Sequence, residues 1–356
     1  MLRELALKEK NGVAIEGDLI ELGQVANLFA SQSLFTDFRI RKAKNTLRRH
    51  DSDLALFAEF LNTRGVEVGD LKTDANAWKG VTWGLVAAFQ AWLLSRGYAV
   101  SSVNVKVSTI KTYAKLAFKA GVLDASDYAL IRSVEGYAKK EYKRIDDKRR
   151  AAGLDTRIGS KKSDAVSLTW AKAKKLKDQP DTPQGRRDAL LMCLLLDHGL
   201  RVSEVAGLKV EDFDLDLNVF IFYRIKTDKT SKHKPTADTL QAAHAYLEND
   251  ANESGTLFRG SYNKGDPELW RKGELTGVMS ERAISKRVRL LGKKIGIENL
   301  SPHDCRHYAA TKYANSKTIR ELMDIFGWNS TAMAGRYIKS ASVVTPEDTI
   351  DLEEGF

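Results

Sequence analysis

The chain has 356 residues, of which 43% are hydrophobic, and its formal net charge is +10 at pH 7. This length suits two domains, each able to bury a core of its own. The positive excess favours a polyanionic partner, although solvated lysines produce the same balance. The chain shows no signal peptide and no apolar run that could span a membrane, and its two cysteines suit buried, reduced thiols. We therefore expect a cytoplasmic protein without a membrane partner.

The N-terminal part of the chain predicts an arm followed by a helical domain. Residues 1–35 have no strong hydrophobic period and are punctuated by glycines, which favours an extended arm or a short helix over a folded module. Apolar residues then recur with helical spacing, and glycines end several of the runs. The predicted helices cover residues 42–65, 82–97, 101–121 and 126–140. Residues 36–140 are therefore expected to form a compact four-helix domain.

Basic residues mark the third predicted helix and the segment that follows the helical domain. Three lysines stand one per turn on a single face of that helix. Residues 141–163 are rich in lysine and arginine and contain few large apolar residues, which predicts an interdomain linker. Both features suit either a solvated surface or contact with a DNA backbone, where each lysine would neutralise a phosphate. The candidate phosphate contacts are Lys111, Lys115, Lys119, Lys143 and Arg144.

Residues 164–340 predict a second, mostly helical domain with a small antiparallel sheet. Thr182 and Pro183 provide a capping residue and a first-turn proline before an apolar run. Residues 219–225 are rich in β-branched and aromatic residues, which predicts a strand, and residues 232–236 return beside it after a turn. Further helices are predicted over residues 238–247, from 280 to 294, and from 302 onward. The expected fold is mainly α, with an α+β second domain.

Five residues suited to phosphate chemistry occur in this second domain. Arg201 lies in a Gly-Leu-Arg-Val-Ser-Glu turn, and His303 and Arg306 are three apart, so the last two can share one helix face. Arginine offers a fork of donors that matches phosphate oxygens, and a tyrosine hydroxyl can act as a covalent nucleophile. Tyr337 follows Trp328 by nine positions. Each residue alone is more often structural, but arginine forks and a tyrosine hydroxyl together suit chemistry on a phosphate group.

This set resembles the tyrosine recombinase (phage integrase) family, over roughly residues 40–340, and the four-helix domain 36–140 resembles that family's core-binding, DNA-binding domain. The catalytic residues that the resemblance implies are Arg201, Lys226, His303, Arg306, Trp328 and Tyr337. The arginines would stabilise charge on the phosphate, the histidine would donate to it or take the tyrosine proton, and the indole N–H would bind it. In the family a hairpin lysine protonates the leaving 5′-oxygen. Lys226 fits this position and Lys229 is the alternative, while Glu204 either orients Arg201 or lies on a helix surface.

The resemblance also implies the reaction and the partners. It implies a site-specific recombinase that cleaves and rejoins double-stranded DNA through a 3′-phosphotyrosine intermediate, with no ATP, metal or other cofactor. It further implies a homo-tetramer on two DNA sites, acting through a Holliday junction, with monomers or dimers when DNA is absent. The acidic tail 341–356 is expected to dock on a neighbouring subunit or to be disordered. Two alternatives stay open, a type IB topoisomerase-like enzyme and a DNA-binding relative that has lost catalysis.

Overall fold

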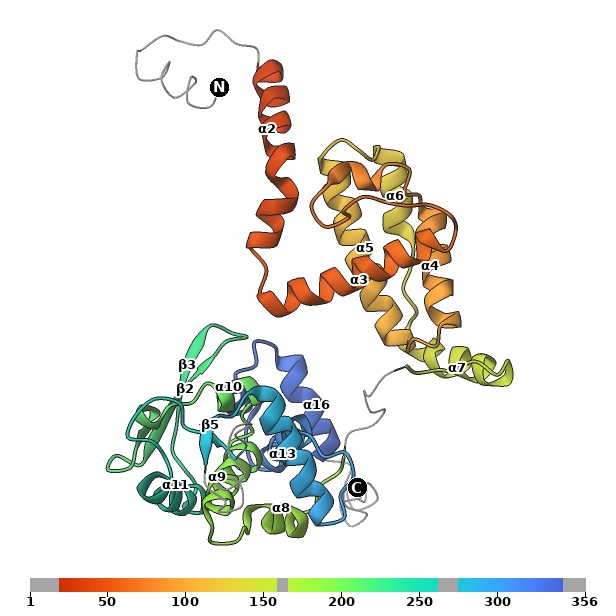
Figure 1. Ribbon diagram of the computed structural model, residues 1–356. Coiled ribbons are helices and arrows are strands. Elements are labelled where there is room, and N and C mark those ends of the chain that lie inside the picture. The colour runs from red at the N-terminus through yellow and green to blue at the C-terminus, as the bar shows by residue number, and fades with distance from the viewer. Residues whose placement is uncertain (1–18, 159–165, 262–274, 342–356) are drawn as a thin grey trace, which may run out of the picture. The chain divides into compact units, whose positions relative to one another are not determined.

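The computed structural model describes residues 19–158, 166–261 and 275–341 (Figure 1). The chain divides into two compact units, Met1–Ser160 and Lys161–Phe356. The first 18 residues of the predicted arm and the predicted acidic tail from residue 342 onward lie outside the described ranges. Within those ranges, no helix is both long and apolar enough to cross a membrane.

The N-terminal unit is a helical bundle around an aromatic core. Its helices are α2 (Leu19–Ile40), α3 (Lys44–Asn62), α4 (Trp83–Ser95), α5 (Val100–Lys119), α6 (Ala125–Ser133) and α7 (Tyr142–Ala151), with a short 3-10 helix η1 (Ala75–Trp78). Helix α5 is central, since α3, α4, α6 and η1 all contact it. The buried Phe57 ring lies 6.1 Å from Trp78 and 5.1 Å from Phe89. The four predicted helices are confirmed as α3 to α6, although α6 ends before the predicted residue 140.

Two segments that the sequence analysis expects to be irregular are helical. Instead of an extended arm or a short helix, α2 is a helix of 22 residues. Its last turns pack on the bundle through the buried Phe35 and through Arg39. The Arg39 guanidinium donates to the Tyr113 hydroxyl at 3.1 Å. Helix α7 lies within the predicted linker. Its buried Arg149 donates to the Asp155 carbonyl at 2.6 Å. A tertiary contact for α2 and a local side-chain contact for α7 therefore support two helices whose hydrophobic period is weak.

The C-terminal unit has the predicted mixture of helices and a small sheet. Its elements are α8 (Trp170–Lys177), α9 (Pro183–Leu196), α10 (Val202–Ala206), β1 (Phe213–Asp214), β2 (Val219–Arg224), β3 (Lys229–His233), α11 (Ala237–Asn249), β4 (Arg259–Gly260), β5 (Thr276–Val278), α13 (Glu281–Lys294), α14 (Pro302–Ala314), α15 (Ile319–Phe326) and α16 (Thr331–Ala341). Strands β1, β2 and β3 form one antiparallel sheet in that order, and β4 pairs with β5. Helices α8, α11 and α14 contact α9, whose last seven residues are all buried. The predicted mainly α fold with a small antiparallel sheet is confirmed.

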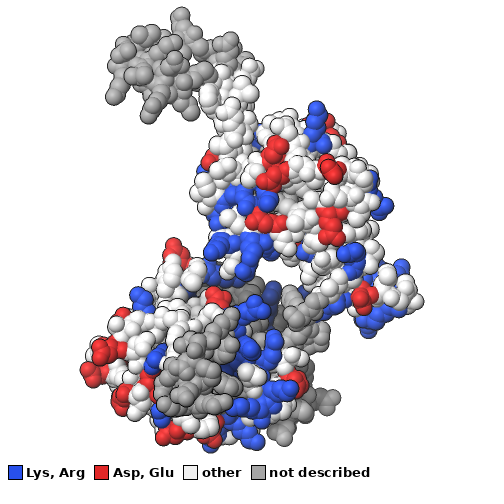
Figure 2. All heavy atoms as spheres, viewed as in Figure 1, with Lys and Arg blue, Asp and Glu red and all other residues white. Residues whose placement is uncertain are grey.

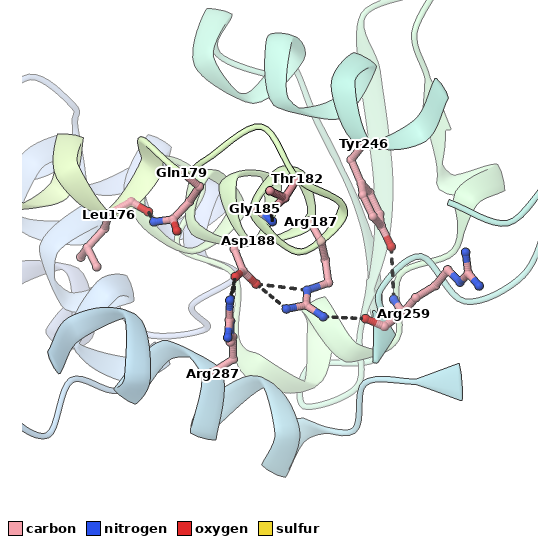
Figure 3. Close-up of polar contacts among 9 residues, drawn as sticks. All are labelled: Leu176, Gln179, Thr182, Gly185, Arg187, Asp188, Tyr246, Arg259 and Arg287. Carbon is pink, nitrogen blue, oxygen red and sulfur yellow. Dashed lines mark hydrogen bonds and ion pairs between the residues drawn. The ribbon is translucent and has the colours of Figure 1, made fainter. Parts of the chain in front are cut away.

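A buried ionic network anchors α9 to its neighbours (Figure 3). Arg187 is fully buried, and it donates to an Asp188 carboxylate oxygen at 2.8 Å and to the Arg259 carbonyl at 3.1 Å. Arg287 from α13 donates to the other Asp188 oxygen at 2.7 Å. These bonds tie α9 to α13 and to β4. Helix α9 leads directly into the turn that carries Arg201. Its anchoring therefore fixes the position of the Arg201 backbone.

Candidate active site

The first predicted arginine begins helix α10 and is held by a glutamate one turn later. The Arg201 backbone N–H donates to one Glu204 oxygen at 2.8 Å, and its guanidinium donates to the other at 2.7 Å. The Glu204 side chain is buried, whereas that of Arg201 is 22% exposed. Of the two expectations for Glu204, orientation of Arg201 fits the structure and a helix-surface position does not. Arg201 thus keeps part of its donor fork accessible to a ligand.

The second predicted arginine, Arg306, is buried on α14. Its two terminal nitrogens each donate at 2.6 Å, one to the Gly199 carbonyl and one to the Phe326 carbonyl. One of them also lies 4.0 Å from Glu204. Burial, followed by the charge of Arg201, lowers the pKa of Arg306 to about 9, while Glu204 opposes the shift. Since the guanidinium is still charged at neutral pH, an anionic ligand would relieve this crowding of positive charge.

Gly199 makes the approach of Arg306 possible. Its φ of +59° lies in the left-handed region, which glycine adopts without strain. A β-carbon at this position would stand 2.5 Å from the Phe326 ring and 3.1 Å from Ala309. The turn before Arg201 therefore packs directly on the elements that carry Arg306 and the C-terminus of α15.

A third arginine, Arg224, completes the cluster and is absent from the predicted site. It is 1% exposed, at the end of β2, and one of its terminal nitrogens lies 3.6 Å from Glu204. Burial lowers the pKa of Arg224, and Glu204 opposes that shift. A signal for it exists in the sequence, because strand alternation places it on the same face as the buried Phe220 and Phe222. The alternation of inward and outward residues along β2 therefore predicts that Arg224 faces inward.

The predicted nucleophile lies against the predicted indole. The Tyr337 ring, on α16, stacks on Trp328 with 5.0 Å between centroids and 7° between planes, and His307 meets its edge at 5.1 Å. The Trp328 side chain is buried and also stacks on Phe326. Burial raises the pKa of Tyr337, and the charges of Arg306 and Arg336 partly offset this. The phenol is therefore protonated at neutral pH in the absence of a ligand.

The remaining predicted residues lie at the surface. His303 is exposed in the first turn of α14, one turn before the buried Arg306. Lys226 is exposed in the turn between β2 and β3, and Lys229 is exposed at the start of β3. The structure thus brings Arg201 and Arg306 together at Glu204, and Arg306 in turn lies 5.9 Å from the Trp328 ring, on which Tyr337 stacks. It places the two lysines on the β2–β3 hairpin, in which Arg224 is the last residue of β2 before the turn.

The predicted phosphate contacts of the N-terminal unit fall into two groups. Lys115 and Lys119 are exposed on α5, beside a groove of about 590 Å³. Lys111 lines the same groove, but its ammonium donates to the Val134 carbonyl at 2.6 Å, and burial lowers its pKa. Lys143 and Arg144 are exposed on α7. Figure 2 shows Lys and Arg side chains gathered on the drawn face of each unit.

Comparisons with known proteins give the family. Residues 167–342 match the phage integrase family, and residues 29–139 match the phage integrase SAM-like domain. The tyrosine recombinase XerA of Pyrococcus horikoshii is 26% identical over 84% of this chain and 84% of its own length. The chain therefore belongs to the phage integrase family. It is an enzyme of the tyrosine site-specific recombinase class.

Solved structures share the fold. The Tn1549 transposon integrase in complex with a circular intermediate DNA has a TM-score of 0.59 and 16% identity, over 86% of this chain and 94% of that one. A lambda integrase tetramer bound to a Holliday junction has a TM-score of 0.50 and 14% identity, over 94% of this chain and 84% of that one. Both agree with a mainly α chain of two units.

Proposed function

We propose that this recombinase cleaves and rejoins double-stranded DNA at specific sites through a covalent 3′-phosphotyrosine intermediate. The observation that carries the proposal is a pair of arginines on one buried carboxylate beside a stacked tyrosine and indole. Arg201 and Arg306 converge on Glu204, and Tyr337 lies on the indole of Trp328 within the field of Arg306. A cationic cluster beside a tyrosine suits a substrate with a phosphodiester group.

In the proposed reaction the phenolic oxygen of Tyr337 attacks the scissile phosphorus. A new phosphorus–oxygen bond forms to the tyrosine, and the bond to the 5′-oxygen breaks. The phenolic proton passes to a base, for which exposed His303 is the candidate, and the 5′-oxygen takes a proton from Lys226 or Lys229. The products are a 3′-phosphotyrosine and a free 5′-hydroxyl. A 5′-hydroxyl can attack the phosphotyrosine in the reverse sense, so strand joining needs no ATP.

The arginines would supply the electrostatic stabilisation. Charge grows on the non-bridging oxygens during attack, and fixed donors aimed at those oxygens stabilise the transition state. Arg306 is held in place by two carbonyls and Arg201 by Glu204, so neither needs to reorganise during the reaction. In this proposal the two guanidiniums take the role that a metal ion plays in other phosphoryl-transfer sites.

Double-stranded DNA is the proposed partner, and a homo-tetramer on two sites is the proposed assembly. The net charge of +10 and the exposed basic residues of α5 and α7 support binding to a polyanion. The two structures with the same fold are integrases bound to DNA, and one is a tetramer on a Holliday junction. By this likeness we propose that strand exchange here also passes through a junction.

The nucleophile is tested by Tyr337→Phe. The DNA site is first found by sequencing DNA that is covalently trapped on the wild-type protein, and a nicked duplex of that site then serves as suicide substrate. Phenylalanine keeps the ring that stacks on Trp328 but lacks the attacking oxygen. We expect normal DNA binding in a gel shift and no covalent adduct on a denaturing gel.

The matched control for this experiment is Tyr308→Phe on α14. Tyr308 is a partly buried tyrosine of the same unit, without the spacing to Trp328. It should form the adduct at close to the wild-type rate. Cleavage by Tyr337→Phe, or loss of the adduct only in Tyr308→Phe, would refute the assignment of the nucleophile.

A further inference from the structure

Arg224 joins three parts of the site through one buried side chain. Its Nε donates to the Ser231 hydroxyl at 2.6 Å, across the β2–β3 hairpin. One terminal nitrogen donates to the Ile325 carbonyl at 2.6 Å, at the end of α15. The other lies 3.6 Å from Glu204. The guanidinium therefore connects the hairpin, the α15 terminus and the carboxylate that holds Arg201.

The contact with α15 parallels that of Arg306. Arg224 binds the Ile325 carbonyl and Arg306 binds the next one, that of Phe326. Helix C-termini leave such carbonyls without helical partners and favour nearby cations. Gly327 follows with a φ of +58°, and a β-carbon there would stand 2.6 Å from the Arg224 side chain. The backbone before Trp328 is thus built closely around the Arg224 side chain.

The hairpin contact fixes the strand that leads to the candidate general acids. Arg224 is the last residue of β2, two positions before Lys226, and it pairs in register with Lys229. Both lysines are exposed, whereas Thr227 between them is partly buried. Phe220 and Phe222 hold β2 on the core, and Arg224 is the last buried residue of the strand before the turn. The direction in which the turn leaves the core therefore depends on how the Arg224 side chain is held.

We propose that Arg224 is a positioning residue, which holds the lysine-bearing hairpin in register with the phosphate-binding arginines so that the lysine can protonate the leaving 5′-oxygen. This inference rests on the proposed function, since it requires a hairpin lysine to act as general acid. Arg224 is itself too buried to contact DNA, so it acts through Ser231, the α15 terminus and Glu204.

The geometry requires an arginine. The partners lie in different directions around one planar group: Ser231 at Nε, the Ile325 carbonyl and His233 at one terminal nitrogen, and Glu204 at the other. A lysine ammonium is a single point charge that ends near the position of the guanidinium carbon, so it cannot reach the Ser231, Ile325 and Glu204 sides together. Arg224→Lys should therefore fail to rescue the defect of Arg224→Met, although it keeps the charge.

The experiment compares two suicide substrates that differ at one atom. One carries the natural 5′-oxygen at the scissile phosphate, and the other carries sulfur there. A thiol has a pKa of about 8.5, so the thiolate leaves without receiving a proton. Loss of a general acid slows the oxygen substrate by about 10²-fold or more and leaves the sulfur substrate nearly unaffected. We measure the rate of covalent adduct formation by the full-length protein on both substrates.

Arg224→Met is expected to slow cleavage of the oxygen substrate by at least about tenfold and that of the sulfur substrate by less than about threefold. Ser231→Ala, which removes only the Nε partner, should give a smaller loss with the same rescue by sulfur, and it tests the inference if Arg224→Met does not fold. Arg201→Lys, which changes the phosphate site, should slow both substrates alike. An Arg224→Met loss that is equal on the two substrates would overturn the inference.

Lys226→Ala and Lys229→Ala separate this inference from the proposed function. One of them should be rescued by sulfur, and that residue is the general acid. If neither is rescued, the general-acid step of the proposed function fails, and this inference fails with it. If one lysine variant is rescued while Arg224→Met and Ser231→Ala are not, the proposed function stands and the inference alone is wrong.

Discussion

At the scale of single residues, Glu204 is the carboxylate that offsets the positive charges of the site. Its carboxylate lies 2.7 Å from Arg201, 3.6 Å from Arg224 and 4.0 Å from Arg306. One negative charge among three positive ones leaves a positive excess, which the single negative charge of a phosphodiester would partly neutralise. Removal of a partner from a buried ion pair commonly costs about 3–5 kcal/mol, because the remaining charge stays buried. A neutral residue at 204 would therefore destabilise the arrangement that binds the phosphate.

His233 makes the stability of the fold depend on pH. Burial, followed by the charge of Arg224, lowers the pKa of His233 to about 4, with Arg306 adding to the shift and Glu204 opposing it. The neighbouring His198 is buried, and its pKa is lowered to about 3. Because these pKa values lie below the unfolded value of about 6.5, protonation favours the unfolded chain. Stability is complete above pH 6.5 and falls as the pH drops from 6.5 toward 4.

We predict that His233→Gln reduces this loss. At pH 5 the wild-type His233 destabilises the fold by about 2 kcal/mol relative to pH 7.5, which glutamine cannot do. Urea unfolding followed by tryptophan fluorescence at the two pH values gives the difference. His244→Gln, on the exposed face of α11, should retain the wild-type loss. A His233→Gln protein with the full wild-type loss would show that the histidine is not buried in the neutral form.

The residues that sequence reasoning finds are those with a fixed spacing. Arg201, Arg306 and Tyr337 could be predicted because their types, order and spacing resemble the motifs of a known family. Arg224 could not be found that way, because its partners Glu204 and Ile325 are distant in sequence and no motif links them. Only the strand period gave a hint. Its role depends on tertiary packing, which spacing does not encode.

At the scale of elements, the start of α9 depends on a glycine that the chain cannot replace. Thr182 caps the helix by accepting from the Gly185 N–H at 3.1 Å, and Figure 3 shows both residues beside the Arg187–Asp188 network. A β-carbon on Gly185 would stand 1.9 Å from the Pro180 carbonyl oxygen. This is far inside van der Waals contact, so either the loop or the helix must move.

We predict that Gly185→Ala lowers the free energy of unfolding by about 3 kcal/mol or more, as severe overpacking does. Gly84→Ala is the matched control, because Gly84 also lies in the first turn of a helix after a threonine, and its nearest neighbour would be 3.8 Å away. Alanine there should be neutral or stabilise by up to about 1 kcal/mol. Urea unfolding of both variants decides, and equal stabilities would contradict the predicted clash.

The lysines of α5 make a second prediction at this scale. If Lys115 and Lys119 each neutralise a phosphate, changing both to glutamine should reduce the slope of log affinity against log salt by about 1.8. Lys111→Gln is the control, since its ammonium already donates to the Val134 carbonyl. It should leave the slope close to wild type. DNA-binding titrations at several salt concentrations measure this slope. An unchanged slope in the double variant would show that these lysines lie on a solvated face and do not contact phosphates.

Elements were predictable where local signals agree. The Thr182–Pro183 start of α9 and the β-branched run of β2 are local, and both appear as predicted. Helices α2 and α7 were missed because their stability comes from few contacts, such as those of Arg39 and Arg149. Neither helix has a strong hydrophobic period. The existence of each follows from what it packs against.

At the scale of the whole molecule, each unit has its own core and its own share of the proposed task. The N-terminal unit is built on a cluster of buried aromatic rings, whereas the C-terminal unit is built around the buried α9. Every residue of the candidate active site belongs to the C-terminal unit. The N-terminal unit therefore contributes to the proposed reaction only by binding DNA, and changes on α5 should alter affinity without altering the cleavage step.

At the same scale, the proposed mechanism predicts how adduct formation by the full-length protein responds to a chelator. In the proposed mechanism, charge on the phosphate is stabilised by Arg201 and Arg306, and the proton transfers use side chains. Adduct formation on the suicide substrate should therefore proceed in EDTA at close to the rate seen with added magnesium, when ionic strength is matched, because divalent ions also weaken DNA binding by screening. Arg201→Lys, assayed in parallel, should lose cleavage under both conditions. If cleavage disappears in EDTA and returns with magnesium, the arginines do not suffice, and the mechanism requires a metal ion.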